Sequence, residues 1–269
     1  MTHCRVCLCL NAAMAHDKGM RLSGHVPNGM TAEQFIRSGA DEIQHMNFIF
    51  LNFMTDHAAD TRTPARFTVV AENAAALDQD SPRVAEFIRL LKERGTVLDP
   101  TLGVFEGRFT VRPGQVSASW ESILSRLPPQ IQRQTKTGGL PAPGEKDQLY
   151  KRSFSAMLKM LKRLYDAGIP LVAGTDNVEG LMLHRELELW VKAGIPAEKV
   201  LQFATLGAAR VAKAGSELGS IEPGKKADLV LASGDPAVNI SDIRRPTVVI
   251  KDGVEYRSPE LYEALGIRP

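Results

Sequence analysis

The chain has 269 residues, and its 33 Lys and Arg residues against 31 Asp and Glu residues give a formal net charge of +2. A hydrophobic share of 43% with a charged share of 24% is ordinary for a folded globular protein and excludes a disordered chain, a collagen and a coiled coil. The nearly balanced charge, with Lys and Arg dispersed along the chain, also excludes a nucleic-acid-binding protein. The length allows one large α/β domain with a small appendage.

The three cysteines, Cys4, Cys7 and Cys9, all lie within the first ten residues. They exclude a disulfide framework, and a C-x-x-C without a second Cys or His pair at finger spacing is a weak signal for zinc or redox chemistry. The same stretch has the outline of a stunted signal peptide, but Asn11 interrupts its apolar run. No apolar run approaches the roughly 18 residues of a membrane span, so we expect a cytoplasmic chain without membrane contact.

One unit recurs from residue 11 onward: an amphipathic stretch, a glycine, and a short apolar strand that ends in a polar residue. The first copy has the stretch 11–18 and the strand 21–25. The second begins at the capping box Thr31-Ala32-Glu33-Gln34 and ends in the strand 42–45. Short apolar strands of this kind are typical of parallel strands buried on both faces.

Two further copies follow the same pattern. Ser81-Pro82 predicts the start of a helix that runs to Gly95 and leads into the strand 96–101. A helix over about 148–167 leads into the strand 170–176. Four helix-to-strand units in succession predict a parallel α/β fold.

The polar strand tips are His25, His45, Thr101 and Asp176. Because ligands bind at the carboxyl ends of parallel strands, we expect these side chains to converge. Two imidazoles and a carboxylate are ligands that Zn²⁺ prefers. Each has a structural alternative: His25 lies in a tight turn, His45 could be a core histidine, and Asp176 could cap the next helix. Their joint placement in successive units favours a site, whereas Thr101 could line it or simply belong to the strand.

A long segment rich in Gly and Pro, 102–152, follows the third strand tip, and segments of this length are often lids. It carries eight Lys or Arg residues against four Asp or Glu residues, which favours an anionic group near the mouth of the site, although a solvated surface explains the charge as well.

The pattern changes after Asp176. Two helices are expected over 183–189 and 197–212, and strand-like pieces with tight turns follow over 215–256. Among these pieces, Lys251-Asp252-Gly253-Val254 has the Asp-Gly pair of a type I′ hairpin. We therefore expect a segment 1–10 that fits none of these units, an α/β domain over 11–214, and a small β appendage with a terminal helix over 215–269.

Several blocks occur together in a specific order. They are Gly24-His25, Ile43-Gln44-His45, Asp99-Pro100-Thr101, Ala173-Gly174-Thr175-Asp176 followed by 184–188, and Gly-Ser-Ile-Glu-Pro-Gly-Lys-Lys-Ala-Asp-Leu-Val over 219–230, ending in Lys251-Asp252-Gly253. This series resembles the amidohydrolase superfamily, and more narrowly its imidazolonepropionase-like and prolidase-like branch. The resemblance covers nearly everything from residue 11 to the end.

The resemblance implies a (β/α)₈ TIM barrel of the metal-dependent hydrolase type. In it His25 would end strand five, His45 strand six and Asp176 strand eight. It also implies one or two divalent ions, zinc by ligand preference, held by His25, His45 and Asp176. Asp176 would in addition be the catalytic general base for water that attacks a C–N carbonyl. His184 could touch substrate, but a solvent-facing helix histidine is the favoured interpretation.

The resemblance also implies an H-x-H on strand one and, in members with two metal ions, a carboxylated lysine on strand four, both before the residue that matches His25. Neither has a counterpart. No H-x-H occurs in the sequence, and Lys18 is the only lysine before His25. The sequence therefore resembles the C-terminal half of an amidohydrolase, with strands five to eight.

Two hypotheses follow. The first is a metal-dependent hydrolase of a small amide, cyclic amide or dipeptide. The second is a catalytically inactive half-barrel that persists as a fragment, forms a homodimer, or assembles with a complementing N-terminal half.

Overall fold

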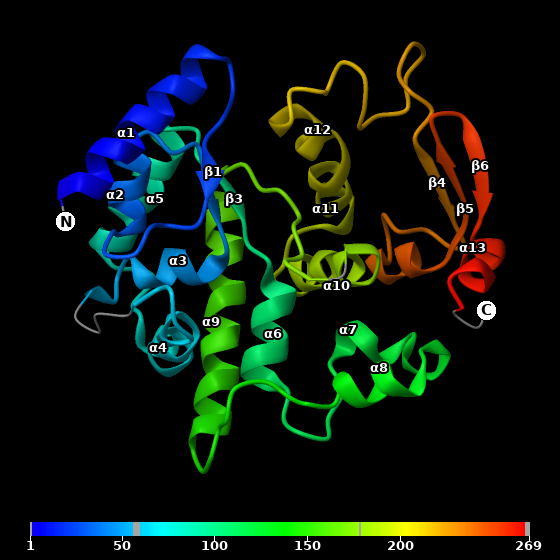
Figure 1. Cartoon of the computed structure of the whole chain (residues 1–269), viewed down its shortest axis with the longest axis horizontal. Coiled ribbons are helices and arrows are strands. Elements are labelled where there is room, and N and C mark those ends of the chain that lie inside the picture. Colours follow the sequence, from blue (N-terminus) through cyan, green and yellow to red (C-terminus); the bar gives the residue numbers. More distant parts are fainter. Residues whose placement is uncertain (1, 56–59, 178, 267–269) are drawn as a thin grey trace.

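The computed structural model describes residues 2–55, 60–177 and 179–266. Figure 1 shows a helix-rich body around one small sheet and a second sheet near the C-terminus. The first part of the chain contains α1 (Thr2–Asp17), β1 (Ser23–Gly24), α2 (Ala32–Arg37), β2 (Glu42–Gln44), α3 (Met46–Leu51), α4 (Ala65–Asn73), η2 (Ala74–Ala76), α5 (Pro82–Glu93) and β3 (Val97–Asp99). The second part contains α6 (Leu102–Thr110), α7 (Ala118–Glu121), η3 (Leu124–Arg126), α8 (Pro129–Gln134), α9 (Lys146–Asp166), α10 (Glu179–Lys192), α11 (Ala197–Gln202), η4 (Phe203–Gly207), α12 (Ala208–Val211), β4 (Leu229–Ala232), η5 (Ile240–Arg244), β5 (Pro246–Lys251), β6 (Val254–Arg257) and α13 (Ser258–Ala264).

The first sheet is parallel and has the order β1-β2-β3, which confirms the α/β prediction. Ile43 of β2 stands opposite Leu98 of β3. The fourth predicted strand, 170–176, is reduced to one parallel bridge between Leu98 and Leu171. Backbone hydrogen bonds from Leu98 N to Pro170 O and from Val172 N to Leu98 O, both 3.0 Å, hold this segment beside β3. The four segments thus lie side by side in chain order.

Local chemistry explains the helix starts. At α2, Gln34 N donates to Thr31 Oγ1 and Thr31 N donates to Gln34 Oε1, so the predicted capping box is present. At α5, Pro82 occupies the first turn as predicted, but the Ser81 hydroxyl donates to Asp78 O instead of capping the helix.

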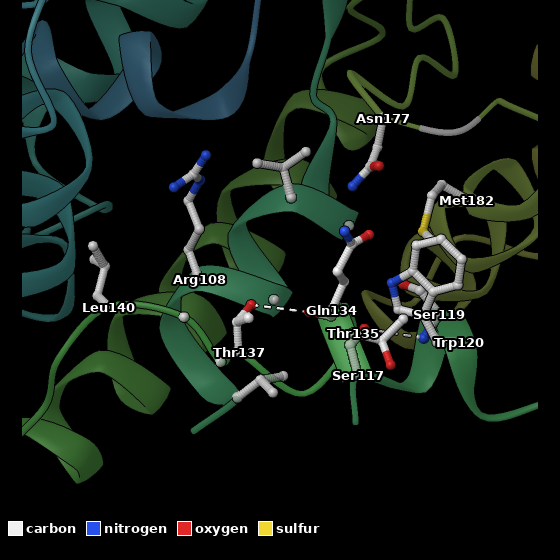
Figure 2. A pocket seen from close by; sticks show the side chains of 16 residues that line it. Arg108, Ser117, Ser119, Trp120, Gln134, Thr135, Thr137, Leu140, Asn177 and Met182 are labelled. Atoms are coloured by element: carbon white, nitrogen blue, oxygen red, sulfur yellow. Dashed lines mark hydrogen bonds between the residues drawn. The ribbon is translucent and has the colours of Figure 1, made fainter. Parts of the chain in front are cut away.

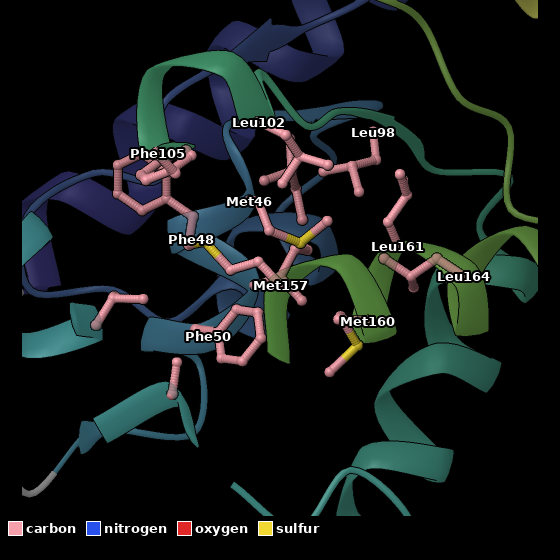
Figure 3. Close-up of a cluster of buried hydrophobic side chains, with 14 of the residues drawn as sticks. Met46, Phe48, Phe50, Leu98, Leu102, Phe105, Met157, Met160, Leu161 and Leu164 are labelled. Carbon is pink, nitrogen blue, oxygen red and sulfur yellow. The ribbon is translucent and has the colours of Figure 1, made fainter. Parts of the chain in front are cut away.

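The hydrophobic core lies between the parallel sheet and the helices α3, α6 and α9 (Figure 3). Phe48 and Phe50 of α3, Phe105 of α6 and Met157 and Met160 of α9 are each at most 2% exposed. At about 25 cal/mol per Å² of apolar surface, burying side chains of this size contributes roughly 1.5–3 kcal/mol each. This packing is what fixes the carboxyl ends of the strands.

The segment 102–152 is not the open loop that its Gly and Pro content predicted. It contains the helices α6, α7 and α8, the short η3, and the first residues of α9. The reason is visible in α6, where Leu102, Phe105 and Phe109 are buried on one side of the helix. Tertiary packing of this apolar side outweighs the Gly content of the sequence.

The predicted boundary after residue 10 falls inside α1, which runs without interruption from Thr2 to Asp17. The predicted helix over 11–18 is therefore the second half of a longer helix, which ends before Gly19 at φ +68°. Across the described ranges, no helix is long and apolar enough to cross a membrane.

The second sheet is antiparallel with the order β4-β5-β6. Asp252 and Gly253 have φ values of 49° and 80°, which is the positive-φ pair that the predicted hairpin requires. The piece 219–224, expected to be strand-like, forms no strand. The predicted helix over 197–212 consists of α11, α12 and the π-helical η4 between them. The terminal helix is α13.

Candidate functional site

The strand tips converge as the sequence predicted. His25 follows β1 directly and His45 follows β2 directly, and their Nε2 atoms lie 2.7 Å apart. On the other side of its ring, His45 Nδ1 lies 2.7 Å from Thr101 Oγ1, which is two residues beyond β3. The side chains after three adjacent parallel strands are therefore linked in one chain of contacts. Two nitrogen atoms at 2.7 Å require a proton or a cation between them, because two lone pairs at that distance repel.

Asp176 stands next to this pair without touching it closely. Its Oδ2 lies 3.9 Å from His45 Nε2, and its side chain is 53% exposed, against 11% for His45. No group of three or more His, Cys, Asp or Glu residues at metal-binding distances occurs among the residues that the structure describes. A tetrahedral zinc site separates two ligand nitrogens by about 3.3 Å, so the histidines need only a small displacement to bind one ion, whereas the carboxylate must move closer.

The backbone is unusual at the same positions. His45, Thr101 and Asp176 have φ values of 70°, 45° and 48°, and they are three of the five non-glycine residues with positive φ in the described ranges. For a β-branched residue such as Thr101 this conformation is unfavourable. Residues in such regions cost about 1–3 kcal/mol each and cluster at functional sites, where the surrounding structure holds them in place. This observation supports a site at the strand tips independently of the side-chain contacts.

The environment keeps both imidazoles neutral. Burial lowers the pKa of His45 to about 4; Asp176 acts in the opposite direction, and the nearby His25 and Arg66 add to the decrease. Burial also lowers the pKa of His25, again with a contribution from Arg66. A neutral imidazole has a free lone pair, so both side chains can act as metal ligands at neutral pH.

Asp99 belongs to this site although the sequence analysis assigned it no role. Gly174 N donates to Asp99 Oδ1 over 3.1 Å, and burial raises the pKa of this carboxyl to about 7. A Cβ at position 174 would overlap the Asp99 carboxylate, so glycine is required there. The sequence signal was the pairing of Asp99-Pro100-Thr101 with Ala173-Gly174-Thr175-Asp176, which the sequence alone could not show to be in contact.

Glu186 of α10 is a second residue that the sequence analysis missed. Its side chain is buried and accepts hydrogen bonds from Leu102 N (2.9 Å), Gly103 N (2.7 Å) and Trp190 Nε1 (2.9 Å). The two backbone donors belong to the first turn of α6, which begins directly after Thr101. Glu186 therefore fixes the start of α6 and with it the end of the β3 tip. Burial raises the pKa of this carboxyl to about 7.

His184 is half-buried in α10, so the expectation of a solvent-facing histidine is wrong. Burial, followed by the positive charge of Arg244, lowers its pKa. It makes no hydrogen bond to His25, His45 or Asp176 within the ranges that the structure describes.

A cavity of about 340 Å³ opens next to Asn177, the residue that follows Asp176 (Figure 2). Its walls come from α6, from the segments 117–120 and 134–140, and from Asn177 and Met182. Most of this wall belongs to the segment 102–152, so that segment shapes the cavity as a set of packed helices and turns. Arg108 and Asn177 point into it from opposite sides.

Comparison with known proteins adds a family and several relatives. The amidohydrolase family matches residues 8–255. The chain is 30% identical over 123 residues to an imidazolonepropionase of Thermoanaerobacter pseudethanolicus, covering 44% of this chain and 28% of that protein. It is 28% identical over 217 residues to a 5-methylthioadenosine/S-adenosylhomocysteine deaminase of Moorella thermoacetica, covering 74% of this chain and 46% of that protein.

Solved structures show a related fold. A Xaa-Pro dipeptidase with bound methionine superposes with a TM-score of 0.57 at 24% identity, over 93% of this chain and 48% of that one. The ochratoxinase of A. niger superposes with a TM-score of 0.58 at 18% identity, over 94% of this chain and 45% of that one. The chain thus spans less than half the length of each of these four proteins. The family match over residues 8–255 confirms the resemblance drawn from the sequence motifs.

Proposed function

The chain belongs to the amidohydrolase family, and from this premise we propose that it is a hydrolase of a carbon–nitrogen bond in a small amide, cyclic amide or dipeptide. Its scaffold would be strands five to eight of a (β/α)₈ barrel, with β1, β2, β3 and the Leu171 segment in that order. The observation that carries the proposal is the contact between His25 and His45 at the carboxyl ends of adjacent parallel strands, where barrel enzymes bind their substrates.

The donor set suits a divalent ion, and zinc fits it best by ligand preference. His25 and His45 would bind it through Nε2, and Asp176 through its carboxylate. When bound, such an ion polarises the substrate carbonyl and lowers the pKa of water. The low pKa of His45 supports this assignment, because its imidazole does not compete for a proton at neutral pH.

Asp176 is the residue we propose for proton transfer. Its carboxylate is half exposed and lies 3.9 Å from His45 Nε2, so both a water molecule and the substrate can reach it. It would accept the proton of the attacking water and return it to the leaving nitrogen. A carboxylate can accept the proton during the attack, and the carboxylic acid that forms can then donate it.

Thr101 and Glu186 are proposed to orient His45. For Nε2 to present its lone pair, Nδ1 must carry the proton and donate it to Thr101 Oγ1, which lies 2.7 Å away. Glu186 holds the turn that follows Thr101 through its bonds to Leu102 N and Gly103 N. The two residues would thus set the tautomer and the direction of the ring.

A second candidate is a half-barrel that is inactive alone and completes its barrel with a partner, either a second copy of the chain or an N-terminal half. The sheet favours it, because β1 pairs only with β2 and the Leu171 segment pairs only with β3 in the described ranges. Unpaired strand edges of this kind present free N–H and C=O groups that can pair with another chain.

Zinc binding separates the two candidates. Equilibrium dialysis of the purified chain, with bound metal measured by mass spectrometry, should give near-stoichiometric zinc for the hydrolase. His25→Ala, His45→Ala and Asp176→Ala should each abolish that binding, while His184→Ala, the matched control on α10, should retain it. Hydrolysis of a panel of dipeptides and cyclic amides is then followed with the loaded chain. No zinc after loading, or unchanged affinity in His45→Ala, would contradict the hydrolase assignment.

A further inference from the structure

Two arginines are held against one aromatic ring near the candidate site. The Cζ atom of Arg66, on α4, lies 4.7 Å from the centre of the Phe67 ring, and that of Arg108, on α6, lies 4.1 Å from the same centre. The two guanidinium groups can therefore be no further apart than the sum of these distances. Phe67 is 8% exposed and packs against Phe105, with 6.0 Å between the centres of the two rings. The ring is thus a fixed support for two positive charges.

The pair differs from the other enclosed arginines. Arg185 binds Glu106 and Glu188, and Arg112 binds Asp147. Among the carboxylates whose side chains the structure describes, none forms an ion pair with Arg66 or Arg108. Bringing two cations close together without an anion costs free energy by mutual repulsion, and an anionic ligand would remove that cost.

Arg108 also connects the pair to the cavity that adjoins Asn177, the residue after Asp176. Burial and Arg66 lower the pKa of Arg108, and Asp176 acts in the opposite direction. The Arg108 side chain lines the cavity of about 340 Å³ into which Asn177, the neighbour of Asp176, also points (Figure 2). A ligand in this cavity can therefore contact both Arg108 and Asn177.

We propose that Arg66, Phe67 and Arg108 form a subsite for the carboxylate of the substrate. This inference rests on the proposed hydrolase function and narrows its substrates to amides with a free carboxylate, such as N-acyl amino acids and dipeptides. A guanidinium group matches a carboxylate with two parallel N–H···O bonds, and the planar fork makes the contact directional. Val104, Leu140 and Trp120 of the same cavity would then contact the apolar part of the substrate.

Binding of a matched pair of ligands tests the subsite without requiring turnover. N-acetyl-L-leucine and N-acetyl-L-leucinamide differ only in the carboxylate, and their affinities for the full-length chain can be measured by ligand-observed NMR and calorimetry. The acid should bind at least about tenfold more tightly than the amide, as expected for one charge-assisted bidentate contact. Arg108→Gln should bring the ratio of the two affinities, acid to amide, close to one. Arg66→Gln should reduce this ratio in part.

Two further variants separate a loss of binding from a loss of folding. Arg108→Lys keeps the positive charge but lacks the planar guanidinium group, so it should keep part of the preference for the acid over the amide. Arg94→Gln, which changes an exposed arginine at the end of α5, should keep all of it. Equal binding of acid and amide, no binding of the acid at millimolar concentration, or an intact preference in a folded Arg108→Gln chain would overturn the subsite. Failure to hydrolyse any amide while the preference is present would instead contradict the proposed function.

Discussion

The two sheets of this protein differ in burial and in what they carry. In the parallel sheet, Ile43 and Leu98 are 0% and 1% exposed, whereas Val230 and Tyr256 of the antiparallel sheet are 59% and 41% exposed. The positive-φ residues of the candidate site all follow the parallel sheet. Only a segment packed on both faces supplies enough contacts to hold several unfavourable backbone conformations at once. The candidate site residues therefore follow the buried sheet, where packing can hold them in place, and none of them lies on the exposed sheet.

The largest effect is expected at Gly174, where the parallel sheet meets the Leu171 segment. Gly174→Ala would force a methyl group into the Asp99 carboxylate, so we expect a loss of about 2–4 kcal/mol in the free energy of unfolding. Denaturant titration measures it. Gly107→Ala is the matched control, because a Cβ there meets no atom within 4 Å and alanine favours a helix by about 0.5–1 kcal/mol. Equal stability of the two variants would contradict the close packing of Gly174 against Asp99.

The second effect is a contribution of His45 to the stability of the metal-free chain, which is lost as the pH falls. The pKa of His45 is lowered from 6.5 to about 4, so between these values the unfolded chain binds a proton that the folded chain does not. The contribution is therefore fully present above pH 6.5 and is lost as the pH falls toward 4, on the order of 2–3 kcal/mol. Unfolding by urea in the presence of a chelator, at pH 7 and pH 5, measures it.

A variant isolates the imidazole from other titrating groups. The raised pKa of Asp99 gives a slope of opposite sign, since that carboxyl favours folding at low pH. Subtracting the pH dependence of His45→Gln from that of the wild type removes the contribution of Asp99, which both proteins share. An identical pH dependence in the two proteins would show that His45 is not the group responsible.

A smaller effect is expected from the hydroxyl that supports His45. Thr101→Val keeps the β-branched shape but removes the partner of His45 Nδ1, so zinc affinity should fall by roughly ten- to a hundredfold. Competition with a chromogenic chelator measures the affinity. Thr110→Val is the control, because its hydroxyl bonds only within α6, to Glu106 O. Unchanged zinc affinity in Thr101→Val would remove Thr101 from the site.

The smallest effect is expected in the antiparallel sheet. Val230→Ala removes two exposed methyl groups and should change the unfolding free energy by no more than about 0.5 kcal/mol. Ile43→Val removes only one methyl group but from a fully buried position, and should cost roughly 0.5–1.5 kcal/mol. Thermal unfolding of both variants checks that Ile43→Val loses more stability than Val230→Ala. A larger cost for Val230→Ala would mean that this face of the sheet is covered in the protein.

Local patterns were sufficient for some features. The capping box at Thr31, Pro82 at the start of α5 and the Asp252-Gly253 hairpin all depend on neighbours in sequence, and each occurs as predicted. The convergence of His25 and His45 was also predictable, because parallel strands place their carboxyl ends on one edge.

Other features depend on contacts between distant segments. The apolar side of α6 was visible in Leu102 and Phe105, but its Gly and Pro surroundings predicted a loop, and only packing against α9 and α10 decides for a helix. The roles of Asp99 and Glu186 follow from which backbone N–H groups their carboxylates meet, and a sequence does not specify those partners.

The bonds of Glu186 to the first turn of α6 also bear on the order of events during synthesis. Glu186 lies 84 residues after Leu102 in the chain, so the turn after Thr101 lacks its acceptor until α10 has been made. Before that point two backbone N–H groups of α6 have no partner from α10, and closing so long a segment costs conformational entropy. On the ribosome, the parallel strands therefore emerge well before the geometry around His45 can be fixed. The site is completed late, and α10 is the element that completes it.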